Sequence, residues 1–463
     1  MIGSCAQPLT SRRTRVIALL AAALAAVSAV AVTVPAAAAT VSRGASATKP
    51  ILVSRCAGRN AEVEEAMSGN NVYVEWIGCD GIGFARSTNG GRTYGSAVEL
   101  PGSAPSVCSV LSCRIYSWDP SIVVSSTGTI YAAFMHGGGG DGFATSPVVD
   151  VSTNHGASFQ HSYVLPQPGG AASFGDRDFI AVGAHGELFV TWDYAPIASE
   201  IQVQCPPSGS CSYANGDLNI VVQHSTNGGR TWSSILPISP GYPDSGADIA
   251  PIVAQPNGTL DVLFQQMPTN TTTLALSPGS EWFTRSTNDG ITWSKPIEIG
   301  ASVGTVSTQT WWIDGDISTD SAGNLYSTWD TQSATKDTGW LSVSKNGGTT
   351  WSTPIEVVSS AVEELTESAG VGKGIVDVAW QTPGSKGYAT FVRPYSLTKG
   401  WLTKALQVSR QYGKPTTWPG DTFGIEALPN AKGGTLGKPV VVTWGSDVTP
   451  SPFSEIFSSV ATP

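Results

Sequence analysis

The sequence repeats one eight-residue pattern five times, and this repetition limits the folds open to the chain. The pattern is Ser-x-Asn-x-Gly-x-(Thr or Ser)-aromatic, at residues 87–94, 152–159, 225–232, 286–293 and 344–351. Asn and Ser side chains can hydrogen-bond nearby backbone, and Gly accepts positive φ, so each copy predicts a tight turn between two strands. The closing aromatic residue can fill the gap to a neighbouring sheet.

A second repeat precedes these turns and consists of a strand that ends in Trp or Phe. The seven endings are Trp76, Phe134, Trp192, Phe264, Trp329, Trp380 and Trp444. The first and last are 368 residues apart over six steps, about 61 residues per step, which is typical of a four-stranded propeller blade. Only 13% of the residues are charged and 52 are Gly, which argues against a helical bundle. We therefore predict an all-β chain with a single propeller of seven four-stranded blades.

The two ends of the chain are expected to share a blade. The seventh unit ends after a third strand near residues 455–460, so it lacks a fourth. Residues 50–54 resemble residues 296–299 and 354–357, which follow the turn in other units. An N-terminal strand would complete the last blade and close the ring, which would remove two exposed sheet edges.

The repeated turn resembles the Asp box, or BNR repeat, of the sialidase superfamily. The resemblance covers nearly all of the chain after the N-terminal segment, although position three is Asn where the family usually has Asp. It implies a propeller in which these turns are structural and lie away from the active site. Sialidases have six blades, so six blades are the alternative to the seven counted from the repeats.

The N-terminal 39 residues are typical of an export signal. Three arginines, at positions 12, 13 and 15, precede an apolar stretch over 16–34, and small residues follow at 37–39. A membrane anchor is the alternative, because the stretch is almost long enough to span a bilayer. We expect cleavage, then a short linker over 40–48 and the propeller over 49–463. The mature chain would be secreted and monomeric, with no stable membrane insertion.

Six cysteines remain after the signal, and their spacing favours disulfides over a metal site. The expected pairs are Cys56 with Cys79, Cys108 with Cys113, and Cys205 with Cys211. The net charge is −10, and three of the 25 basic residues fall in the signal, which has no acids. The rest of the chain is therefore more acidic still and has no run of Lys or Arg, which excludes nucleic acid as a partner.

Ligands of a propeller bind most readily at the mouth of its central channel, where the loops before the inner strands converge. Five of these loops pair an aromatic residue with a carboxylate. The pairs are Trp118 with Asp119, Phe174 with Asp176, Tyr242 with Asp244, Trp312 with Asp314, and Trp418 with Asp421. Sugar rings stack on aromatic faces and bond carboxylates, so these residues are candidate substrate-binding groups. The alternative is that the rings pack between blades and the carboxylates cap turns.

The resemblance to sialidases also implies catalytic residues. Sialidases clamp the substrate carboxylate with three arginines and use a Tyr nucleophile with a Glu partner and an Asp acid/base. The matching positions are Arg59, Arg177 and Arg410 for the clamp, Tyr412 and Glu367 for the nucleophile pair, and Asp119 for the acid/base. A bidentate guanidinium is suited to holding a carboxylate. The alternative for each arginine is a surface or inter-blade ion pair.

Two functions follow from these patterns. The first is a sialidase-like exo-glycosidase that acts on a glycan terminus at the channel mouth. The second is a non-catalytic propeller that binds glycan or protein. We expect no cofactor and no metal; calcium at Asp314, Asp316 and Asp320 is the exception considered, and turn capping is the alternative there.

Overall fold

The computed structural model describes residues 45–56, 58–105, 107–108, 113–114, 116–137, 145–168, 173–196, 202–204, 212–215, 217–240, 245–268, 279–300, 315–331, 337–360, 365–384, 387–409, 420, 422–428, 438–447 and 454–463. The chain divides into two units, Met1–Arg43 and Gly44–Pro463, and every described residue belongs to the second. The predicted signal peptide and its cleavage site lie outside the described residues.

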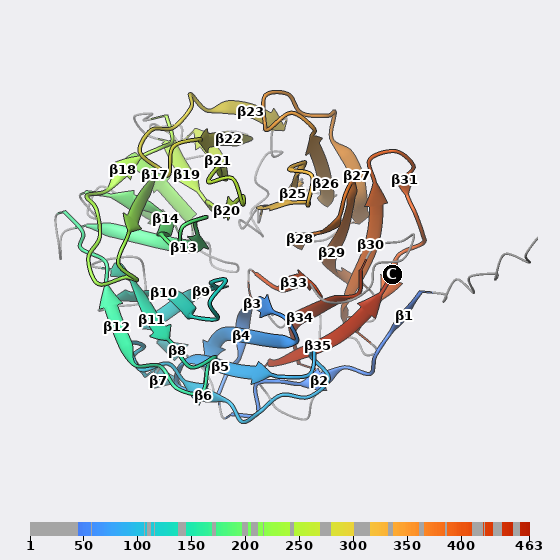
Figure 1. Ribbon diagram of the computed structural model, residues 1–463, viewed down its shortest axis with the longest axis horizontal. Helices are drawn as coiled ribbons and strands as arrows, with labels where there is room; N and C mark the ends of the chain where they lie inside the picture. Colours follow the sequence, from blue (N-terminus) through green and yellow to red (C-terminus); the bar gives the residue numbers. More distant parts are fainter. Residues whose placement is uncertain are drawn as a thin grey trace, which may run out of the picture. The chain divides into compact units, whose positions relative to one another are not determined.

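The described unit is an all-β propeller of seven antiparallel blades, so the predicted fold and blade number are confirmed. The blades follow one another around an axis, each with its first strand innermost (Figure 1). Blades one to four are β3 (Ala61–Ser68), β4 (Asn71–Gly78), β5 (Gly81–Ser87) and β6 (Val98–Glu99); β9 (Ser117–Val124), β10 (Ile130–Gly137), β11 (Thr145–Ser152) and β12 (His161–Val164); β13 (Phe174–Val182), β14 (Leu188–Ala195), β17 (Asp217–Ser225) and β18 (Leu236–Pro237); and β19 (Ser245–Asp248) with β20 (Ile252–Ala254), β21 (Leu260–Pro268), β22 (Ser280–Ser286) and β23 (Ile297–Gly300).

Blades five to seven complete the ring. They are β24 (Gly315–Thr319), β25 (Leu325–Thr331), β26 (Asp337–Ser344) and β27 (Ile355–Ser360); β28 (Leu365–Gly372), β29 (Ile375–Gly384), β30 (Gly387–Ser396) and the short β31 (Gly400–Trp401) and β32 (Leu406–Gln407); and β33 (Gly424–Ala427), β34 (Val440–Ser446) and β35 (Glu455–Thr462). Two short hairpins lie outside the blades: β7 (Val107–Cys108) with β8 (Cys113–Arg114), and β15 (Gln202–Gln204) with β16 (Ser212–Asn215).

The N-terminal strand closes the ring as predicted. Strand β2 (Ile51–Leu52) pairs antiparallel with β35 and supplies the missing edge of the seventh blade. Strand β1 (Ser46–Ala47) also pairs with β35, although it falls in the segment expected to be a linker. The blade therefore begins before residue 49. The backbone N–H and C=O groups along β35 are thus hydrogen-bonded rather than left as an open edge.

The five repeated turns owe their shape to hydrogen bonds within the motif. In each copy the Ser hydroxyl donates to the Asn Oδ1 and accepts the N–H of the Gly at position five. The Asn Nδ2 donates to the side-chain hydroxyl of the residue at position seven. The backbone N–H of that same residue donates to the Asn Oδ1. Asn is therefore a full substitute for the usual Asp here, because its amide makes both contacts.

The aromatic residue of each turn packs against the preceding blade. Phe159 meets Phe84 edge-on with ring centroids 4.9 Å apart, and Trp351 meets Phe283 at 5.2 Å. The Tyr94 hydroxyl lies 2.9 Å from the Ser458 hydroxyl of the seventh blade. These contacts place one aromatic ring in each of several inter-blade gaps, as the sequence predicts.

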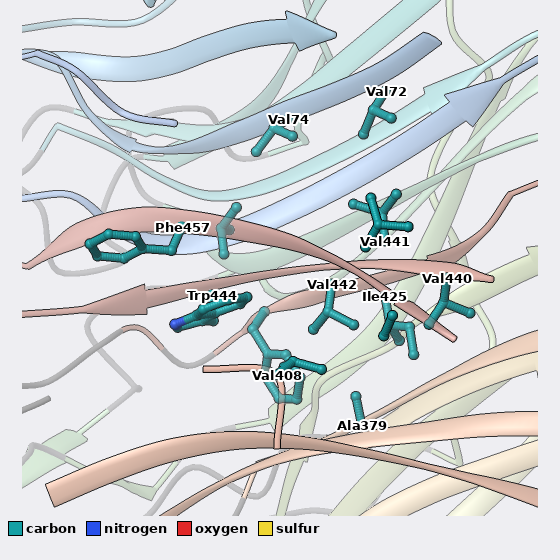
Figure 2. Packing of buried hydrophobic residues seen from close by; sticks show 14 of the residues in the cluster. Val72, Val74, Ala379, Val408, Ile425, Val440, Val441, Val442, Trp444 and Phe457 are labelled. Carbon is teal, nitrogen blue, oxygen red and sulfur yellow. The ribbon is translucent and has the colours of Figure 1, made fainter. Parts of the chain in front are cut away.

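The core is divided among the gaps between blades. Figure 2 shows the cluster around the seventh blade, where Val441 of β34 lies toward Val72 of β4, and Val442 and Trp444 lie on the opposite face toward Val408. Separate clusters fill the other gaps around the ring. All seven predicted strand-ending aromatic residues are buried in the second strand of their blade. Burial of these large rings against the neighbouring sheet stabilises the propeller.

Candidate functional site at the start of the inner strands

The inner strands of four consecutive blades begin with the same unusual backbone. Glu62, Asp119, Arg177 and Ile249 are non-Gly residues with φ of 47°, 52°, 51° and 52°. Strand pairing shifts register beside the first three of them, as expected for β-bulges. Positive φ is costly for residues with a Cβ, and such conformations concentrate at functional sites. The bulges turn these residues out of the regular pleat at one rim of the channel.

Hydrogen bonds join the bulges of the first three blades into a chain. The Asp119 backbone N–H donates to Glu62 Oε2 over 3.3 Å, and the Arg177 backbone N–H donates to Asp119 Oδ2 over 2.8 Å. The Trp118 Nε1 donates to Asp176 Oδ1 over 2.5 Å. We call Glu62, Trp118, Asp119, Asp176, Arg177 and Asp178 the mouth cluster.

The carboxyl group of Asp119 holds its proton unusually strongly. Burial raises its pKa well above the ordinary value, and the nearby charges of Asp176 and Glu62 raise it further. The Arg177 guanidinium lowers this pKa, and a hydrogen bond with Asp176 raises it. Burial likewise raises the pKa of Asp178. Asp119 therefore stays protonated to a higher pH than an exposed carboxyl, because burial and nearby negative charge both disfavour its ionised form.

Asp119 is also the member of the cluster that solvent reaches best. It is half-buried, whereas Glu62, Asp176, Arg177 and Asp178 are between 1% and 9% exposed. A ligand at the rim would therefore meet residue 119 first, although the Asp119 carboxyl itself is withdrawn from solvent. The other side chains hold this carboxyl in place and set its electrostatic surroundings.

A cavity of about 380 Å³ lies on the axis beyond the mouth cluster, none of whose residues lines it. Its walls are the inner strands of all seven blades, including residues 64–67, 121–124 and 179–182. These segments follow Glu62, Asp119 and Arg177 directly along β3, β9 and β13, so the mouth cluster stands at one end of the channel. In an antiparallel blade the turn after the third strand lies at the opposite end. The repeated turns are therefore remote from the mouth cluster.

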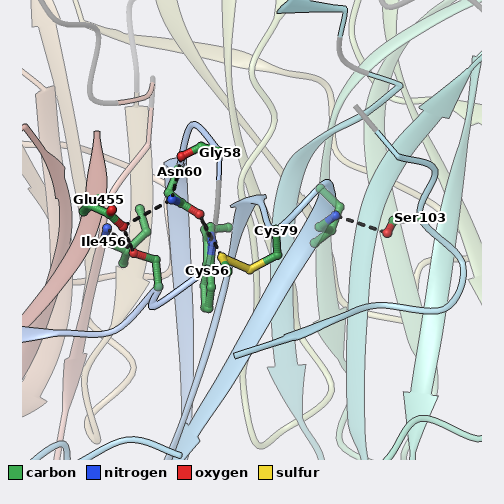
Figure 3. Close-up of a disulfide and its surroundings, with 10 residues drawn as sticks. Cys56, Gly58, Asn60, Cys79, Ser103, Glu455 and Ile456 are labelled. Atoms are coloured by element: carbon green, nitrogen blue, oxygen red, sulfur yellow. Dashed lines mark hydrogen bonds between the residues drawn. A yellow bond between two sulfur atoms is a disulfide. The ribbon is translucent and has the colours of Figure 1, made fainter. Parts of the chain in front are cut away.

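The loop before β3 is fixed to both neighbouring blades. Cys56 and Cys79 form a disulfide, which confirms the first predicted pair (Figure 3). Asn60 Oδ1 accepts the Trp76 Nε1 hydrogen over 2.9 Å, and Asn60 Nδ2 donates to Glu455 Oε2 over 3.3 Å. Cys108 and Cys113 face each other in the β7–β8 register, and their side chains lie outside the described part, as do Cys205 and Cys211.

Four of the residues predicted from the sequence come together in the mouth cluster. They are Trp118, Asp119, Asp176 and Arg177. Arg59 is half-buried in the loop before β3. Glu367 lies on β28, and its side chain falls outside the described residues. Arg410, Tyr412, Trp312, Asp314, Trp418, Asp421 and the pair Tyr242 and Asp244 also lie outside them. Their proposed roles remain predictions.

The two described aromatic partners are part of the core. Phe174 is fully buried, and Trp118 is 9% exposed and packs in the cluster between the first and second blades. The contact of Trp118 with Asp176 is through its Nε1 hydrogen. These rings therefore position the carboxylates in this structure, which is the alternative considered for such pairs.

Sequence patterns missed Glu62, Asp178 and the neighbouring Gly420. Glu62 belongs to Ala-Glu-Val-Glu-Glu, which gives no local sign of a bulge. A Cβ on Gly420 would overlap the backbone nitrogen and Cα of Glu62, so only glycine fits at this contact between the seventh and first blades. The one available signal was the recurrence of an acid one to three residues after the first residue of each inner strand.

Asp320 caps a turn, and Asp316 on β24 joins its inner strand to the next one, β28. Asp320 Oδ1 accepts the backbone N–H groups of Ala322 and Asn324, and Asp316 Oδ2 accepts the N–H and hydroxyl of Ser368. Among the described residues no group of three or more His, Cys, Asp or Glu side chains is arranged to ligate a metal ion directly. A search of the same residues finds no helix of the length and hydropathy needed to cross a membrane.

Comparison with known proteins finds similar folds among solved structures but no match by sequence. No protein-family model matches the sequence, and no curated protein matches it. Among solved structures, an ulvan lyase of a new polysaccharide lyase family, bound to -[GlcA(1-4)Rha3S]-, is 10% identical with a TM-score of 0.54; the match covers 88% of this chain and 95% of that one. A protein of unknown function from Dyadobacter fermentans is 11% identical with a TM-score of 0.50, covering 90% and 99%.

Sialidases are also among the structural neighbours. A Hadza microbial sialidase is 11% identical with a TM-score of 0.49, and the match covers 84% of this chain and 73% of that one. At such low identity these likenesses show the propeller fold alone.

Proposed function

We propose that this propeller acts on carbohydrate at the channel mouth, with Asp119 as the acid/base. The observation that carries the proposal is the raised pKa of the Asp119 carboxyl, which lies at the start of an inner strand beside Asp176 and Arg177. A protonated carboxylic acid can donate to the oxygen of a glycosidic bond as the bond breaks. The carbohydrate-active propellers among the structural neighbours support this substrate class.

The contact between Asp119 and Asp176 limits the catalytic roles that the two carboxyl groups can have. Two carboxyl groups on either side of a glycosidic bond are about 5 Å or more apart, whereas hydrogen-bonded carboxyls are far closer. We therefore assign the proton transfer to Asp119 and the positioning of its carboxyl to Asp176. A nucleophile must come from elsewhere, and Tyr412 assisted by Glu367 remains the proposal from sequence.

The guanidinium of Arg177 would serve the substrate side of the same site. It is near enough to Asp119 to lower the pKa of that carboxyl. A sialidase-like clamp would need Arg59 and Arg410 beside it, and an acidic sugar would then be held by charge-assisted hydrogen bonds. The exo-glycosidase that cleaves a terminal acidic sugar is the finer form of the proposal. We further propose that residues 1–39 direct secretion and that the mature chain is a monomer.

A non-catalytic binding propeller is the second candidate. The Asp119 and Glu62 carboxylates both accept backbone N–H groups of the next blade. The same hydrogen bonds would be needed if these carboxylates only held neighbouring blades together. The mouth would then present a rigid polar rim to a glycan or a protein without turning it over.

Assaying turnover of a panel of aryl glycosides that includes a fluorogenic sialoside separates the catalytic proposal from the binding proposal. Asp119→Asn keeps the acceptor for the Arg177 N–H but removes the proton, so kcat/KM should fall by about 10²–10⁴-fold. Asp289→Asn is the matched control, because Asp289 is exposed, has a φ of 56° and lies in a turn far from the mouth. Its kcat/KM should equal that of the wild type.

Two outcomes would contradict the catalytic proposal. Turnover that survives in Asp119→Asn would show that another group supplies the proton. No turnover across the panel, together with glycan-array binding that persists in Asp119→Asn, would identify a binding module instead.

A further inference from the structure

The connections at the end of the propeller opposite the mouth carry an excess of positive charge. The chain as a whole is acidic, with a net charge of −10. Among the described residues of these connections, however, Asp289 is the one exposed acid. The exposed cations of the same connections are seven: Arg92, Arg230, Lys295, Lys345, Lys373, Lys399 and Lys404. Because they come from separate blades, no run of basic residues in the sequence marks this surface.

Three consecutive blades add an aromatic ring to this end. Trp232, Trp293 and Trp351 close the repeated turns of the third, fourth and fifth blades, which are neighbours in the ring (Figure 1). Each ring packs on the core of a gap between blades but is only half-buried, so part of it stays open to solvent. The corresponding Tyr94 of the first blade is buried. The three tryptophans thus offer ring surface along one arc of the propeller.

Two of these rings are held by equivalent hydrogen bonds within their own turns. Trp293 Nε1 donates to the Gly290 carbonyl and Trp351 Nε1 donates to the Gly348 carbonyl, each over 3.1 Å. In both turns the bond joins position eight of the motif to position five. The rings are therefore already ordered when a ligand arrives, which lowers the entropy cost of binding.

Each of the three turns combines its ring with one exposed cation, which is Arg230, Lys295 or Lys345. Arg230 Nη1 donates to the Asn227 carbonyl over 3.4 Å, which ties the exposed guanidinium to the turn and leaves the rest of its donor fork accessible. Ile291, which is 68% exposed, adds apolar surface in the fourth blade. An acidic sugar chain matches this surface, because sugar rings pack on aromatic faces and carboxylates pair with guanidinium and ammonium groups.

We propose that the turns of the third to fifth blades bind an acidic polysaccharide at a surface separate from the mouth. The residues of this surface, which we call the turn-end track, are Arg230, Trp232, Trp293, Lys295, Lys345 and Trp351. A polymer bound there would hold the protein by one end and leave the mouth free. A lipid surface matches less well, because Ile291 is the one largely exposed aliphatic side chain in the described part of these turns, and membrane binding buries a whole apolar face.

Titration calorimetry with polygalacturonate, a polymer of carboxylated sugars, tests the proposal. Dextran supplies sugar without charge, polyglutamate supplies carboxylates without sugar, and vesicles of phosphatidylglycerol and phosphatidylcholine supply an anionic lipid surface. We expect polygalacturonate to bind about tenfold tighter than each of the other three, since it alone combines rings with carboxylates. Added NaCl should weaken its binding, because exposed ion pairs are screened.

Variants locate the site. The double variant Arg230→Gln, Lys345→Gln should weaken polygalacturonate binding by about three- to tenfold, because two exposed ion pairs are lost. The matched control is Lys49→Gln, Arg55→Gln, which removes the same charge from exposed residues outside the turns and should bind as the wild type does. Asp289→Asn removes the exposed acid and should tighten binding by about twofold, a gain that misfolding cannot produce.

The absence of a binding isotherm with polygalacturonate would overturn the proposal. Equal affinity for polyglutamate would show that charge alone acts, and higher affinity for the vesicles would assign the surface to lipid. Equal losses in the track variant and its control would mean that the polymer binds elsewhere. Asp119→Asn should leave polygalacturonate binding unchanged, and a loss there would place the polymer at the mouth. Turnover of small aryl glycosides does not depend on the turn-end track, so the two proposals fail separately.

Discussion

At the scale of single residues, the geometry of the mouth depends on close backbone contact between the seventh and first blades. Gly420 has a φ of 115° and packs directly on the Glu62 backbone. The Val63 N–H donates to the Thr422 carbonyl over 3.3 Å beside this contact. Glu62 Oε2 in turn accepts the Asp119 N–H. A substitution at Gly420 is therefore expected to displace Glu62 and, through its hydrogen bond, Asp119 in the second blade.

We expect Gly420→Ala to lower the free energy of unfolding by roughly 2–4 kcal/mol, because it combines positive-φ strain with overlap on Glu62. Gly186→Ala is the control, since Gly186 has a φ of 88° and no neighbour where its Cβ would lie. It should cost about 1 kcal/mol. Urea unfolding measures the free energy of unfolding of both variants. Equal decreases in the two would show that the contact with Glu62 is unimportant.

At the scale of the element, each turn is stabilised by a local network that depends on one amide side chain. Asn227 accepts hydrogen bonds from the Ser225 hydroxyl and the Thr231 N–H, and it donates to the Thr231 hydroxyl. The Trp232 that ends this motif packs in the gap between the second and third blades. A distorted turn would therefore also loosen the packing between blades.

We expect Asn227→Ala to destabilise the protein by about 1–3 kcal/mol, since three hydrogen bonds are lost. Asn227→Asp keeps the acceptor oxygen and should cost less than half as much. Differential scanning calorimetry of the two variants checks the order. A larger loss in Asn227→Asp than in Asn227→Ala would contradict the proposed geometry.

At the scale of the whole molecule, buried carboxylic acids determine how stability varies with pH. Burial raises the pKa of Glu75, Asp178, Glu281 and Asp377 well above their ordinary values, and that of Asp150 to about 6. All five are at most 1% exposed. Above pH 4 the folded chain consequently holds more protons than the unfolded chain, so the free energy of unfolding decreases as pH rises.

We expect the melting temperature to be several degrees higher at pH 5 than at pH 8. Each retained proton is worth roughly 1.4 kcal/mol per unit of pKa shift, and this stabilisation is lost as pH rises through the folded-state pKa values. Thermal melts from pH 5 to pH 8, in chelator and at constant ionic strength, test this. Asp377→Asn should make the melting temperature decrease less steeply with pH. A melting temperature that rises with pH would contradict the role given to the buried carboxylic acids.

The sequence by itself determined the repeating parts of this protein. The turn motif, the blade spacing and the shared seventh blade depend on hydrogen bonds within a few residues or on regular periodicity, so each copy carries its own signal. The Cys56–Cys79 pair followed from assigning the closely spaced cysteines to each other first. The mouth cluster was decided only by the tertiary structure. Glu62, Asp119 and Arg177 are about 57 residues apart, and their positive φ values arise where neighbouring blades meet. Sequence patterns could propose Asp119 and Arg177 but not their contact, because no local interaction encodes the packing of one inner strand against the next.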